Sequence, residues 1–314
     1  MSTFARHYPN FALYGVDWDT RSTNARATLA DGTALDQILR ESLDDLHDSH
    51  VDITFGTEEF EAKPGPEWSH DRRAIFDTSA TYLNSPLIEQ QDAGLYHGWL
   101  KNNVGYIAIV HMTPEGSIWQ QPMPHAQKLT RALAKEYADA TSVIIDLRSN
   151  SGGYDTVALT YASLMSDTPW IVGRKSVRIA PDQFDPWGAI IAPGMDTALD
   201  VPTAVLVSSY TVSAAEVGLM ALRELPQVTL IGENSAGAIS DKMDRQLPNG
   251  WAFSLPHQRF ETPDGTSFEG LGVPPDIKVD MNINAFALGQ DVILETALAH
   301  LRRQLLLNSR FPEH

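Results

Sequence analysis

The chain contains no cysteine in its 314 residues. This absence excludes disulfide bonds, thiolate metal ligands and a cysteine nucleophile. No apolar run approaches the roughly 20 residues that a membrane-spanning helix needs. The first residues, MSTFARHYPNFALYGVDWD, lack the basic start and apolar stretch of a signal peptide. We expect no membrane span. The compartment stays open between the cytoplasm and, if a signal has been removed, the periplasm or the exterior.

Positive charge is scarce, with 23 Lys and Arg against 40 Asp and Glu and a formal net charge of -17. Nucleic-acid partners are disfavoured because binding to phosphates needs a basic face. Metal-site motifs such as HExxH are missing, and so are the glycine-rich motifs GxGxxG and GxxxxGK[ST] of nucleotide sites. His47 and His50 form a close pair, but two histidines are too few for a zinc site. The sequence therefore predicts neither a metal nor a cofactor.

The first quarter of the chain has a helical pattern. In residues 34–50, ALDQILRESLDDLHDSH, the leucines and the isoleucine recur at helical spacing up to Ser49 and His50. The next residues, VDITFG, alternate like a strand, and residues 58–73 are polar and proline-bearing, which is typical of an exposed connection. We predict a helical N-terminal region over residues 1–75 and a catalytic domain over residues 76–314.

From residue 104 onward, apolar strands alternate with helices. We predict strands at VGYIAIVHM, SVIIDLR, TAVLVSS and VTLIG, and helices near residues 125–140, after Gly153 and over residues 214–225. This alternation favours a parallel sheet covered on both faces, hence an α/β fold. Beyond Gly237 the pairs Asn249-Gly250 and Asp264-Gly265 indicate hairpin turns. A final helix is expected near residues 285–307.

Two strand ends carry the residues suited to chemistry. One strand runs out into Arg148, Asn150 and the pair Gly152-Gly153 before a helix, where free backbone N–H groups could stabilise an oxyanion. Another strand leads to Ser213 at the start of a helix, where the next amide, that of Ala214, could complete the same hole. A serine before a helix is also a common N-cap, and Ser213-x-x-Glu216 fits a capping box. The motif alone leaves both interpretations open.

Six segments in order, LxxLxDSH, GYIxI, DLRSNSGG, TVSAAE, GENSAG and EGLGVPPD, resemble the serine peptidases of the carboxyl-terminal processing peptidase and tricorn-core family. The resemblance implies a ClpP/crotonase-like ββα superhelix. It implies Ser213 as the nucleophile, with an oxyanion hole from the amides of Gly152 or Gly153 and of Ala214. The stretch between His50 and Val104 is too short for a PDZ domain of about 90 residues, which favours the tricorn-like branch over the PDZ-bearing one.

The identity of the general base divides the two branches of this family. Ala238 stands where the processing-peptidase branch has its lysine, so a Ser-Lys dyad would require Lys242 to reach in from a few residues on. The tricorn-like branch implies His50 as the base, with Ser49 and Glu269 as the groups that orient it. Judged from spacing alone, other histidines stay open as competitors: His47, His97, His111 and His257.

The predicted function is a serine-type peptidase that hydrolyses short or unfolded polypeptides through an acyl-enzyme on Ser213. A catalytically inactive binding protein of the same fold and a crotonase-like acyl-CoA enzyme stay as alternatives. The insertion WIVGRKSVRIAPDQFDPWGAIIAPG carries Trp170, Phe184 and Trp187, which would either line a specificity pocket or pack a local core. The sequence does not decide between a monomer and a homo-oligomer.

Overall fold

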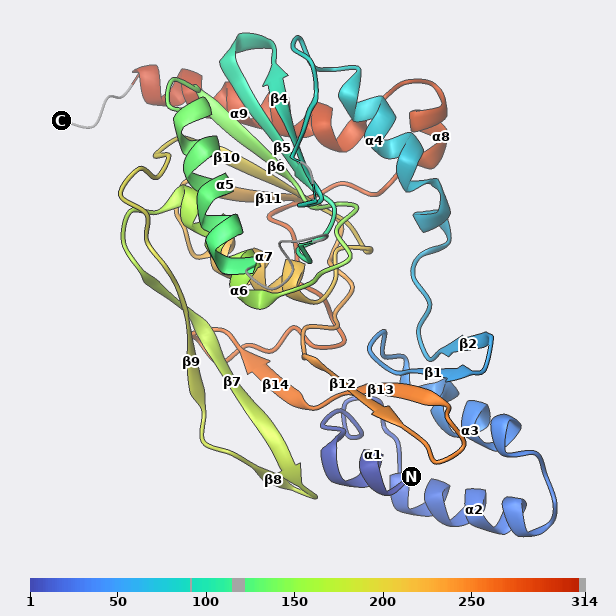
Figure 1. Ribbon diagram of the computed structural model, residues 1–314. Helices are drawn as coiled ribbons and strands as arrows, with labels where there is room; N and C mark the ends of the chain where they lie inside the picture. The colour runs from blue at the N-terminus through green and yellow to red at the C-terminus, as the bar shows by residue number, and fades with distance from the viewer. Residues whose placement is uncertain (91, 115–121, 311–314) are drawn as a thin grey trace. The chain divides into compact units, whose positions relative to one another are not determined.

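The computed structural model describes residues 1–90, 92–114 and 122–310 (Figure 1). The chain divides into two compact units, which are described separately. Unit 1 comprises residues 1–65, 173–190 and 238–270, and unit 2 comprises residues 66–172, 191–237 and 271–314. Each unit is therefore built from separate stretches of the chain, whereas the predicted domains, 1–75 and 76–314, follow chain order. That boundary stays a prediction.

Unit 2 contains a seven-stranded sheet of order β15-β11-β10-β6-β5-β4-β3. Its strands are β3 (Ile88–Gln90), β4 (Leu95–Leu100), β5 (Val104–Ile109), β6 (Ser142–Asp146), β10 (Thr203–Val207), β11 (Val228–Gly232) and β15 (Ile277–Lys278). The pairs from β5 to β15 are parallel, which confirms the predicted parallel sheet. Strands β3 and β4 extend it in antiparallel fashion. Every residue of β5, β6 and β10 is buried, as expected for strands covered on both faces.

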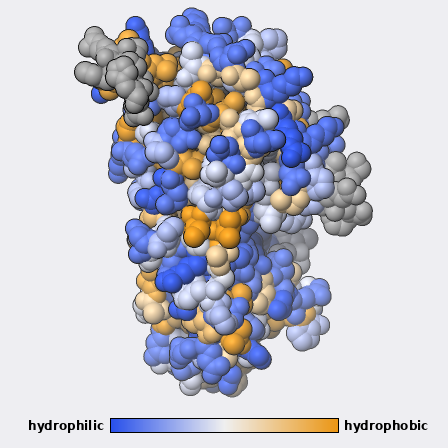
Figure 2. All heavy atoms as spheres, turned by 90° about the vertical axis from the view of Figure 1, so that its left-hand side faces the viewer, coloured by the Kyte–Doolittle hydropathy of each residue, from blue (hydrophilic) through white to orange (hydrophobic). Residues whose placement is uncertain are grey.

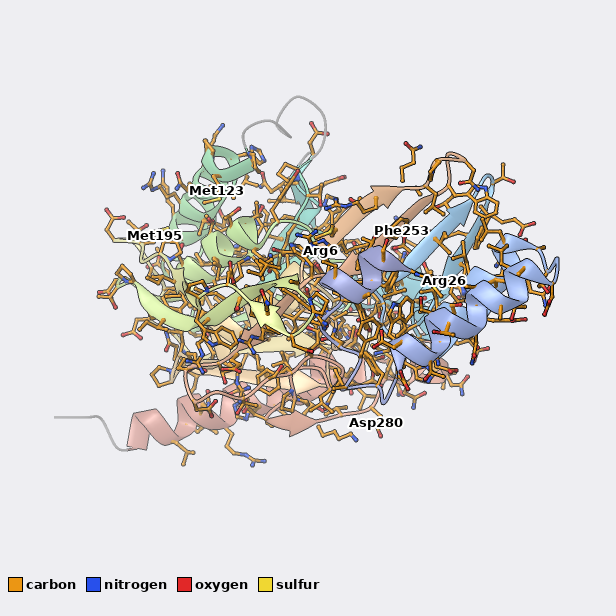
Figure 3. All side chains as sticks on the ribbon, turned by 90° about the horizontal axis from the view of Figure 1, so that it is seen from below. Arg6, Arg26, Met123, Met195, Phe253 and Asp280 are labelled. Atoms are coloured by element: carbon orange, nitrogen blue, oxygen red, sulfur yellow. The ribbon has the colours of Figure 1, made fainter. Side chains whose placement is uncertain are left out.

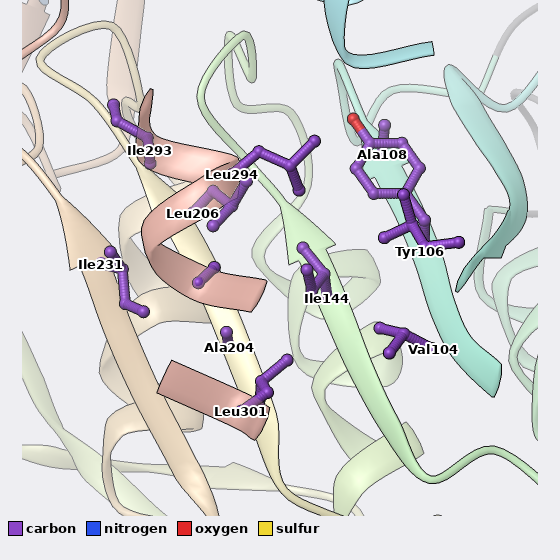
Figure 4. Packing of buried hydrophobic residues seen from close by; sticks show 12 residues of the cluster. Val104, Tyr106, Ala108, Ile144, Ala204, Leu206, Ile231, Ile293, Leu294 and Leu301 are labelled. Atoms are coloured by element: carbon purple, nitrogen blue, oxygen red, sulfur yellow. The ribbon is translucent and has the colours of Figure 1, made fainter. Parts of the chain in front are cut away.

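Helices cover both faces of this sheet. The helices of this unit are α4 (Arg72–Ala80), α5 (Pro122–Glu136), α6 (Asp155–Ala162), α7 (Ala214–Arg223), α8 (Ile283–Ala287) and α9 (Val292–Arg310), and its short helices include η2 (Glu67–Asp71), η3 (Lys101–Asn103) and η5 (Ser163–Met165). Ile144 of β6 packs with Leu294 and Leu301 of α9 in one buried cluster (Figure 4). Its neighbour Ile145 points the other way, to a cavity of ≈ 20 Å³ that α5, α6 and α7 also line. Alternate residues of the strand thus pack against two different layers of helices.

The final helix differs from its prediction. Instead of one helix over residues 285–307, the chain forms α8 and α9, separated at residues 288–291. Gly289 there has φ +75°, a left-handed conformation that glycine adopts without steric cost. The Asp291 side chain then accepts the Leu294 N–H at 3.0 Å and caps α9. The helical spacing of apolar residues continues across residues 288–291, so this pattern could not reveal the break between α8 and α9.

Unit 1 combines helices with a four-stranded antiparallel sheet of order β12-β13-β1-β2. Its elements are α1 (Ser2–His7), α2 (Trp18–Ala30), α3 (Leu35–Leu43), η1 (Asp44–Leu46), β1 (Asp52–Phe55), β2 (Glu58–Glu61), β12 (Lys242–Gln246) and β13 (Ala252–Pro256). The predicted hairpin turn at Asn249-Gly250 joins β12 to β13. Residues 58–61 were expected in an exposed connection but pair with β1 as β2. The N-terminal region is therefore partly a sheet.

Aromatic side chains form the core of unit 1. Phe4 stacks on Trp18 at 5.2 Å and on Phe253 at 6.0 Å between ring centroids. In Figure 3, Arg6 marks α1, Arg26 marks α2 and Phe253 marks the strand β13. The start of the chain is thus anchored by burial, because Phe4 and Tyr8 are both buried.

The insertion after residue 169 forms β structure. Strand β7 (Trp170–Ala180) pairs with β14 (Gln258–Glu261), β8 (Gln183–Phe184) and β9 (Gly188–Ala192). The guanidinium carbon of Arg259 lies 3.9 Å from the ring centroid of Phe184 and 4.3 Å from that of Trp187. Trp170 Nε1 donates to the Ala221 carbonyl at 3.0 Å. All three aromatics are half-buried and have partners within their own surroundings.

Figure 2 shows hydrophilic side chains over most of one face, interrupted by small hydrophobic patches. Within residues 1–90, 92–114 and 122–310, no helix is both long enough and apolar enough to cross a bilayer.

Candidate active site

Ser213 occupies a strained corner between β10 and α7 in unit 2. Its backbone has φ +62° and ψ -127°, a combination that residues other than glycine rarely adopt. Such strain costs about 1–3 kcal/mol and is concentrated at functional sites. The corner is held in place by its neighbours: Val212 N–H donates to the Asn150 carbonyl at 3.3 Å, and Ala236 N–H donates to the Thr211 carbonyl at 2.9 Å. The surrounding loops therefore impose the conformation of Ser213.

The Glu216 carboxylate links this corner to the loop after β11. It is fully buried and accepts the Ser213 N–H at 3.1 Å, which supplies one half of the capping box expected from the sequence. The same carboxylate accepts the Ser235 hydroxyl at 2.6 Å and the Gly237 N–H at 2.7 Å. The Glu216 N–H donates to the Ser213 carbonyl at 2.8 Å. Glu216 thus anchors the backbone of Ser213 as well as capping the helix.

Gly152 and Gly153 lie beside Ser213. Their φ angles are +85° and +141°, in the region that favours glycine. A Cβ at residue 152 would stand 2.7 Å from the Cβ of Ser213, and one at residue 153 would stand 2.3 Å from the carbonyl carbon of Met112. The close approach of this loop to the serine therefore requires glycine at both positions.

The amides of this loop are not equivalent. The Gly152 N–H already donates to the side-chain oxygen of Asn150 at 2.8 Å. For the N–H groups of Gly153 and Ala214, the described residues provide no hydrogen-bond acceptor. The sequence had offered Gly152 and Gly153 as equal candidates, because only the fold shows which amide the Asn150 side chain uses.

Arg148 does not face an anion site. Its guanidinium is fully buried and donates to Asp146 at 2.7 Å and to Asp291 at 2.7 Å. Burial opposes the charge of Arg148, but the two carboxylates outweigh it and raise the pKa of the guanidinium further above its usual value. For Asp291, burial would raise the pKa of the carboxyl, but the charge of Arg148 prevails and lowers it. Arg148 therefore ties the start of the glycine loop to the N-terminus of α9.

His50 lies in unit 1, just before β1, with 5% of its surface exposed. Asp48 Oδ1 accepts the His50 backbone N–H at 2.9 Å. Burial lowers the pKa of the imidazole, the Asp48 charge opposes this shift, and the Lys242 charge adds to it. Within the described part of the chain, Nδ1 is buried without a hydrogen-bond partner. The ring is therefore held mostly neutral near pH 7, as a general base requires.

Glu269 is buried in the same unit, with 6% of its surface exposed. Its Oε2 accepts the N–H groups of Ile239 and Ser240 at 3.1 and 3.2 Å, and its Oε1 accepts from Asn10 Nδ2 at 3.5 Å. Ser49, the other expected orienting group, is half-buried between Asp48 and His50 in sequence. Glu269 thus contacts the backbone of residues 239–240 and the side chain of Asn10.

Lys242, the alternative base, lies on β12 and forms an ion pair with Asp52. The Ser254 hydroxyl also donates to Asp52, at 2.6 Å. The Lys242 side chain is thus already engaged with a carboxylate. The ion pair therefore weighs against Lys242 as the proton acceptor.

The competing histidines have local roles. His97 Nε2 lies 2.8 Å from Gln90 Nε2, and His97 Nδ1 lies 3.3 Å from the Tyr137 hydroxyl. His257 Nδ1 lies 3.0 Å from the Asp241 carbonyl oxygen. The ring of His111 packs against Gly94, where a Cβ would stand 2.5 Å from it. His47 has φ +46° and ends η1.

The structure thus brings the predicted residues together in two groups. Ser213, Gly152, Gly153 and Ala214 meet in unit 2, whereas Ser49, His50, Glu269 and Lys242 belong to unit 1. The sequence interpretation missed Asp48, which accepts the His50 backbone N–H, and also Tyr8 and Asn10, which donate to Asp48. Asp48 directly precedes Ser49-His50 and could have been found by that proximity, whereas nothing in the local pattern marks Asn10. In the described portion of the chain, no group of three or more His, Asp or Glu side chains is placed to hold a metal ion.

Comparison with known proteins connects these features to one family. The model of peptidase family S41 matches residues 103–279. The chain is 27% identical over 188 residues to the carboxy-terminal processing protease CtpA of Bacillus subtilis, a match that covers 60% of this chain and 37% of that protein. It is 28% identical over 200 residues to the carboxy-terminal-processing protease of Bartonella bacilliformis, covering 62% of this chain and 43% of the relative. The chain thus matches less than half the length of either protein.

Solved structures show a similar fold. A protein from Parabacteroides merdae superposes with a TM-score of 0.79 at 21% identity, over 96% of this chain and 93% of its own. Mature CPAF superposes with a TM-score of 0.71 at 13% identity, over 97% of this chain and 95% of its own. At these identities the likeness concerns the mixed α/β fold alone.

Proposed function

This chain belongs to peptidase family S41, and from that membership we propose that it is a serine-type peptidase with Ser213 as its nucleophile. One observation carries the proposal: Ser213 is held at a strained strand-to-helix corner, beside a loop that requires glycine at two positions. A serine that served only as a helix cap would need neither the strain nor the close glycines. Both features suit a hydroxyl presented to a substrate carbonyl.

The oxyanion hole in this proposal is formed by the N–H groups of Gly153 and Ala214. Two donors aimed at the developing negative charge contribute several kcal/mol to transition-state stabilisation, about 3–4 kcal/mol for one such donor. The Gly152 N–H donates to the Asn150 side chain and is not part of the hole. Gly152 instead allows the loop to approach Ser213 closely, because it has no side chain. Ala214 lies at the first position of α7, where the N–H groups have no partner within the helix.

His50 is the proposed general base. It takes the proton of the Ser213 hydroxyl while Oγ forms a bond to the substrate carbonyl carbon, and it returns the proton to the amine as the C–N bond breaks. Water then attacks the acyl-enzyme with His50 again as the base, which releases the acid and restores Ser213. Ser49 and Glu269 are proposed to orient the imidazole, with Glu269 acting through the backbone of Ser240. Lys242 remains the alternative base.

The proposed substrates are short or unfolded polypeptides, which can place an extended backbone at the carboxyl ends of the parallel strands. The named relatives are carboxy-terminal processing proteases, and a preference for chain ends is part of the proposal. We further propose that residues 76–314 form a ClpP/crotonase-like ββα superhelix that carries the nucleophile, and that residues 1–75 supply the Ser-His motif. Self-association into a homo-oligomer is compatible with this assignment.

A fluorophosphonate probe, which reacts with activated serines, tests the assignment directly. We expect the full chain to be labelled and Ser213→Ala to be unlabelled. Turnover of a peptide library by His50→Ala, Glu269→Ala and Lys242→Ala then identifies the base. Loss in His50→Ala together with activity in Lys242→Ala supports the proposal, and the reverse pattern assigns the base to Lys242. Folded protein that neither reacts with the probe nor cleaves peptides would favour an inactive binding protein or an acyl-CoA enzyme.

A further inference from the structure

The side chain of Asn10 lies between two buried carboxylates in unit 1. Its Nδ2 donates to Asp48 Oδ2 at 3.2 Å and reaches Glu269 Oε1 at 3.5 Å. These residues are 38 and 259 positions away in the chain, and all three are at most 7% exposed. A buried carboxylate needs donors around it, because unpaired charge in a low dielectric is strongly unfavourable. Asn10 supplies a donor to both at once.

Each carboxylate holds a different piece of backbone next to His50. Asp48 Oδ1 accepts the His50 N–H at 2.9 Å, which fixes the main chain of the proposed base. Glu269 Oε2 accepts the N–H groups of Ile239 and Ser240, and the Ser240 backbone is one of the groups that act on the pKa of the His50 imidazole. Asp48 therefore fixes the main chain of His50, and Glu269 fixes the main chain of residues 239–240.

We propose that Asn10 is a positioning residue for His50. Its side-chain amide connects Asp48, which holds the His50 backbone, to Glu269, which holds the backbone of residues 239–240. The proposal rests on the proposed function of His50 as general base. Tyr8 assists from the same segment, because its hydroxyl donates to Asp48 Oδ2 at 3.0 Å. The first residues of the chain are held in place by the buried rings of Phe4 and Tyr8. Through Tyr8 and Asn10, this segment helps to position the proposed general base.

Burial and the nearby charges both act on the pKa of His50. Burial is the largest influence and disfavours the charged imidazole; Asp48 and Asp241 favour the charged form, and Lys242 disfavours it. Removing the neutral Asn10 amide changes none of these charges. We expect water to replace the amide beside the two carboxylates and to weaken the burial that lowers the His50 pKa, so that this pKa should rise towards its ordinary value of about 6.5.

The test compares Asn10→Ala with the full wild-type chain in two measurements. In peptide cleavage, we expect kcat to fall on the order of 10- to 100-fold, the effect of a slightly misplaced catalytic group, while KM stays within about twofold. In NMR titration of the imidazole resonance that disappears in His50→Gln, we expect the midpoint to move to higher pH. The second measurement does not depend on activity, so failure of the proposed function leaves it interpretable.

Asn24→Ala, the same change at an exposed position of α2, is the matched control and should leave both measurements unchanged. Tyr8→Phe removes one donor to Asp48 and keeps the ring, so it replaces Asn10→Ala if that variant does not fold, with effects in the same direction. Folded Asn10→Ala with wild-type kcat and an unmoved titration would overturn the proposal. Loss of kcat with an unmoved titration would overturn it as well, because Asn10 would then act elsewhere.

Discussion

A Cβ at Gly152 would stand 2.7 Å from the Cβ of Ser213, closer than non-bonded Cβ atoms approach. The glycine loop and the serine corner therefore fit together only because residue 152 has no side chain. The corner is further fixed by the hydrogen bond from Val212 N–H to the Asn150 carbonyl. We derive the first prediction from this contact.

Gly152→Ala should unfold more easily than wild type and should lose reactivity at Ser213. Gly250→Ala is a matched control, since Gly250 has φ +88°, close to the +85° of Gly152, but open space where a Cβ would lie. Both variants carry the strain of a positive φ, on the order of 1 kcal/mol, and the clash adds to it only at residue 152. Chemical denaturation and fluorophosphonate labelling measure the two effects. Equal losses of stability in the two variants would contradict the clash.

Ser213→Gly should be more stable than Ser213→Ala. Neither variant has a hydroxyl, so neither should be labelled, but only glycine adopts φ +62° and ψ -127° without steric strain. The expected difference in the free energy of unfolding is about 1 kcal/mol, because the flexibility of glycine in the unfolded chain offsets part of the relieved strain. Parallel urea denaturation curves provide the measurement. An alanine variant as stable as the glycine variant would show that the corner relaxes once the hydroxyl is gone.

Arg148→Met should destabilise unit 2 strongly. It removes the partner of two buried carboxylates, Asp146 and Asp291, and breaking a buried ion pair from one side costs about 3–5 kcal/mol. Arg73→Met, which removes an exposed partner of Asp77, should leave the denaturation midpoint nearly unchanged. Thermal or urea unfolding separates the two variants. A small effect of Arg148→Met would mean that Asp146 and Asp291 find other donors.

The pH dependence of activity should follow His50. Burial lowers the pKa of its imidazole, so the acid limb of the kcat/KM profile should lie below the ordinary histidine value of about 6.5. Lys242→Ala removes a positive charge that lowers this pKa and should move the limb to higher pH while keeping activity. A limb that stays in place in Lys242→Ala would show that this charge does not act on the base.

The same shift has a consequence for stability. The pKa of His50 is lower in the folded state, so the unfolded chain binds the proton more readily. The contribution of neutral His50 to the free energy of unfolding is therefore fully present above about pH 6.5, the pKa of histidine in the unfolded chain. This contribution is lost as the pH falls through the lower pKa of His50 in the folded state. In His50→Gln this part of the pH dependence should disappear. Unfolding midpoints measured from pH 7.5 down to pH 5 would reveal the difference.

Local residue patterns were sufficient to identify the parallel strands β5, β6, β10 and β11, the helices between them, and the loops that carry Gly152, Gly153 and Ser213. These features follow from periodicity, from apolar runs and from the turn preferences of glycine, all of which act over a few residues. Local patterns could not reveal the helix break at Gly289, because an apolar stripe continues across it. They could not reveal strand β2 either, because its formation depends on pairing with β1.

The functions of individual polar groups depended on folding. That Arg148 pairs with Asp291 and that Asn10 joins Asp48 to Glu269 are contacts between residues 143, 38 and 259 positions apart, separations at which local sequence patterns carry no signal. A hydrogen bond acts over about 3 Å, so its partners are set by which distant segments the core brings together. Composition and motif order thus establish the kind of fold and the nucleophile to propose, whereas the donors and acceptors around it are assigned by packing.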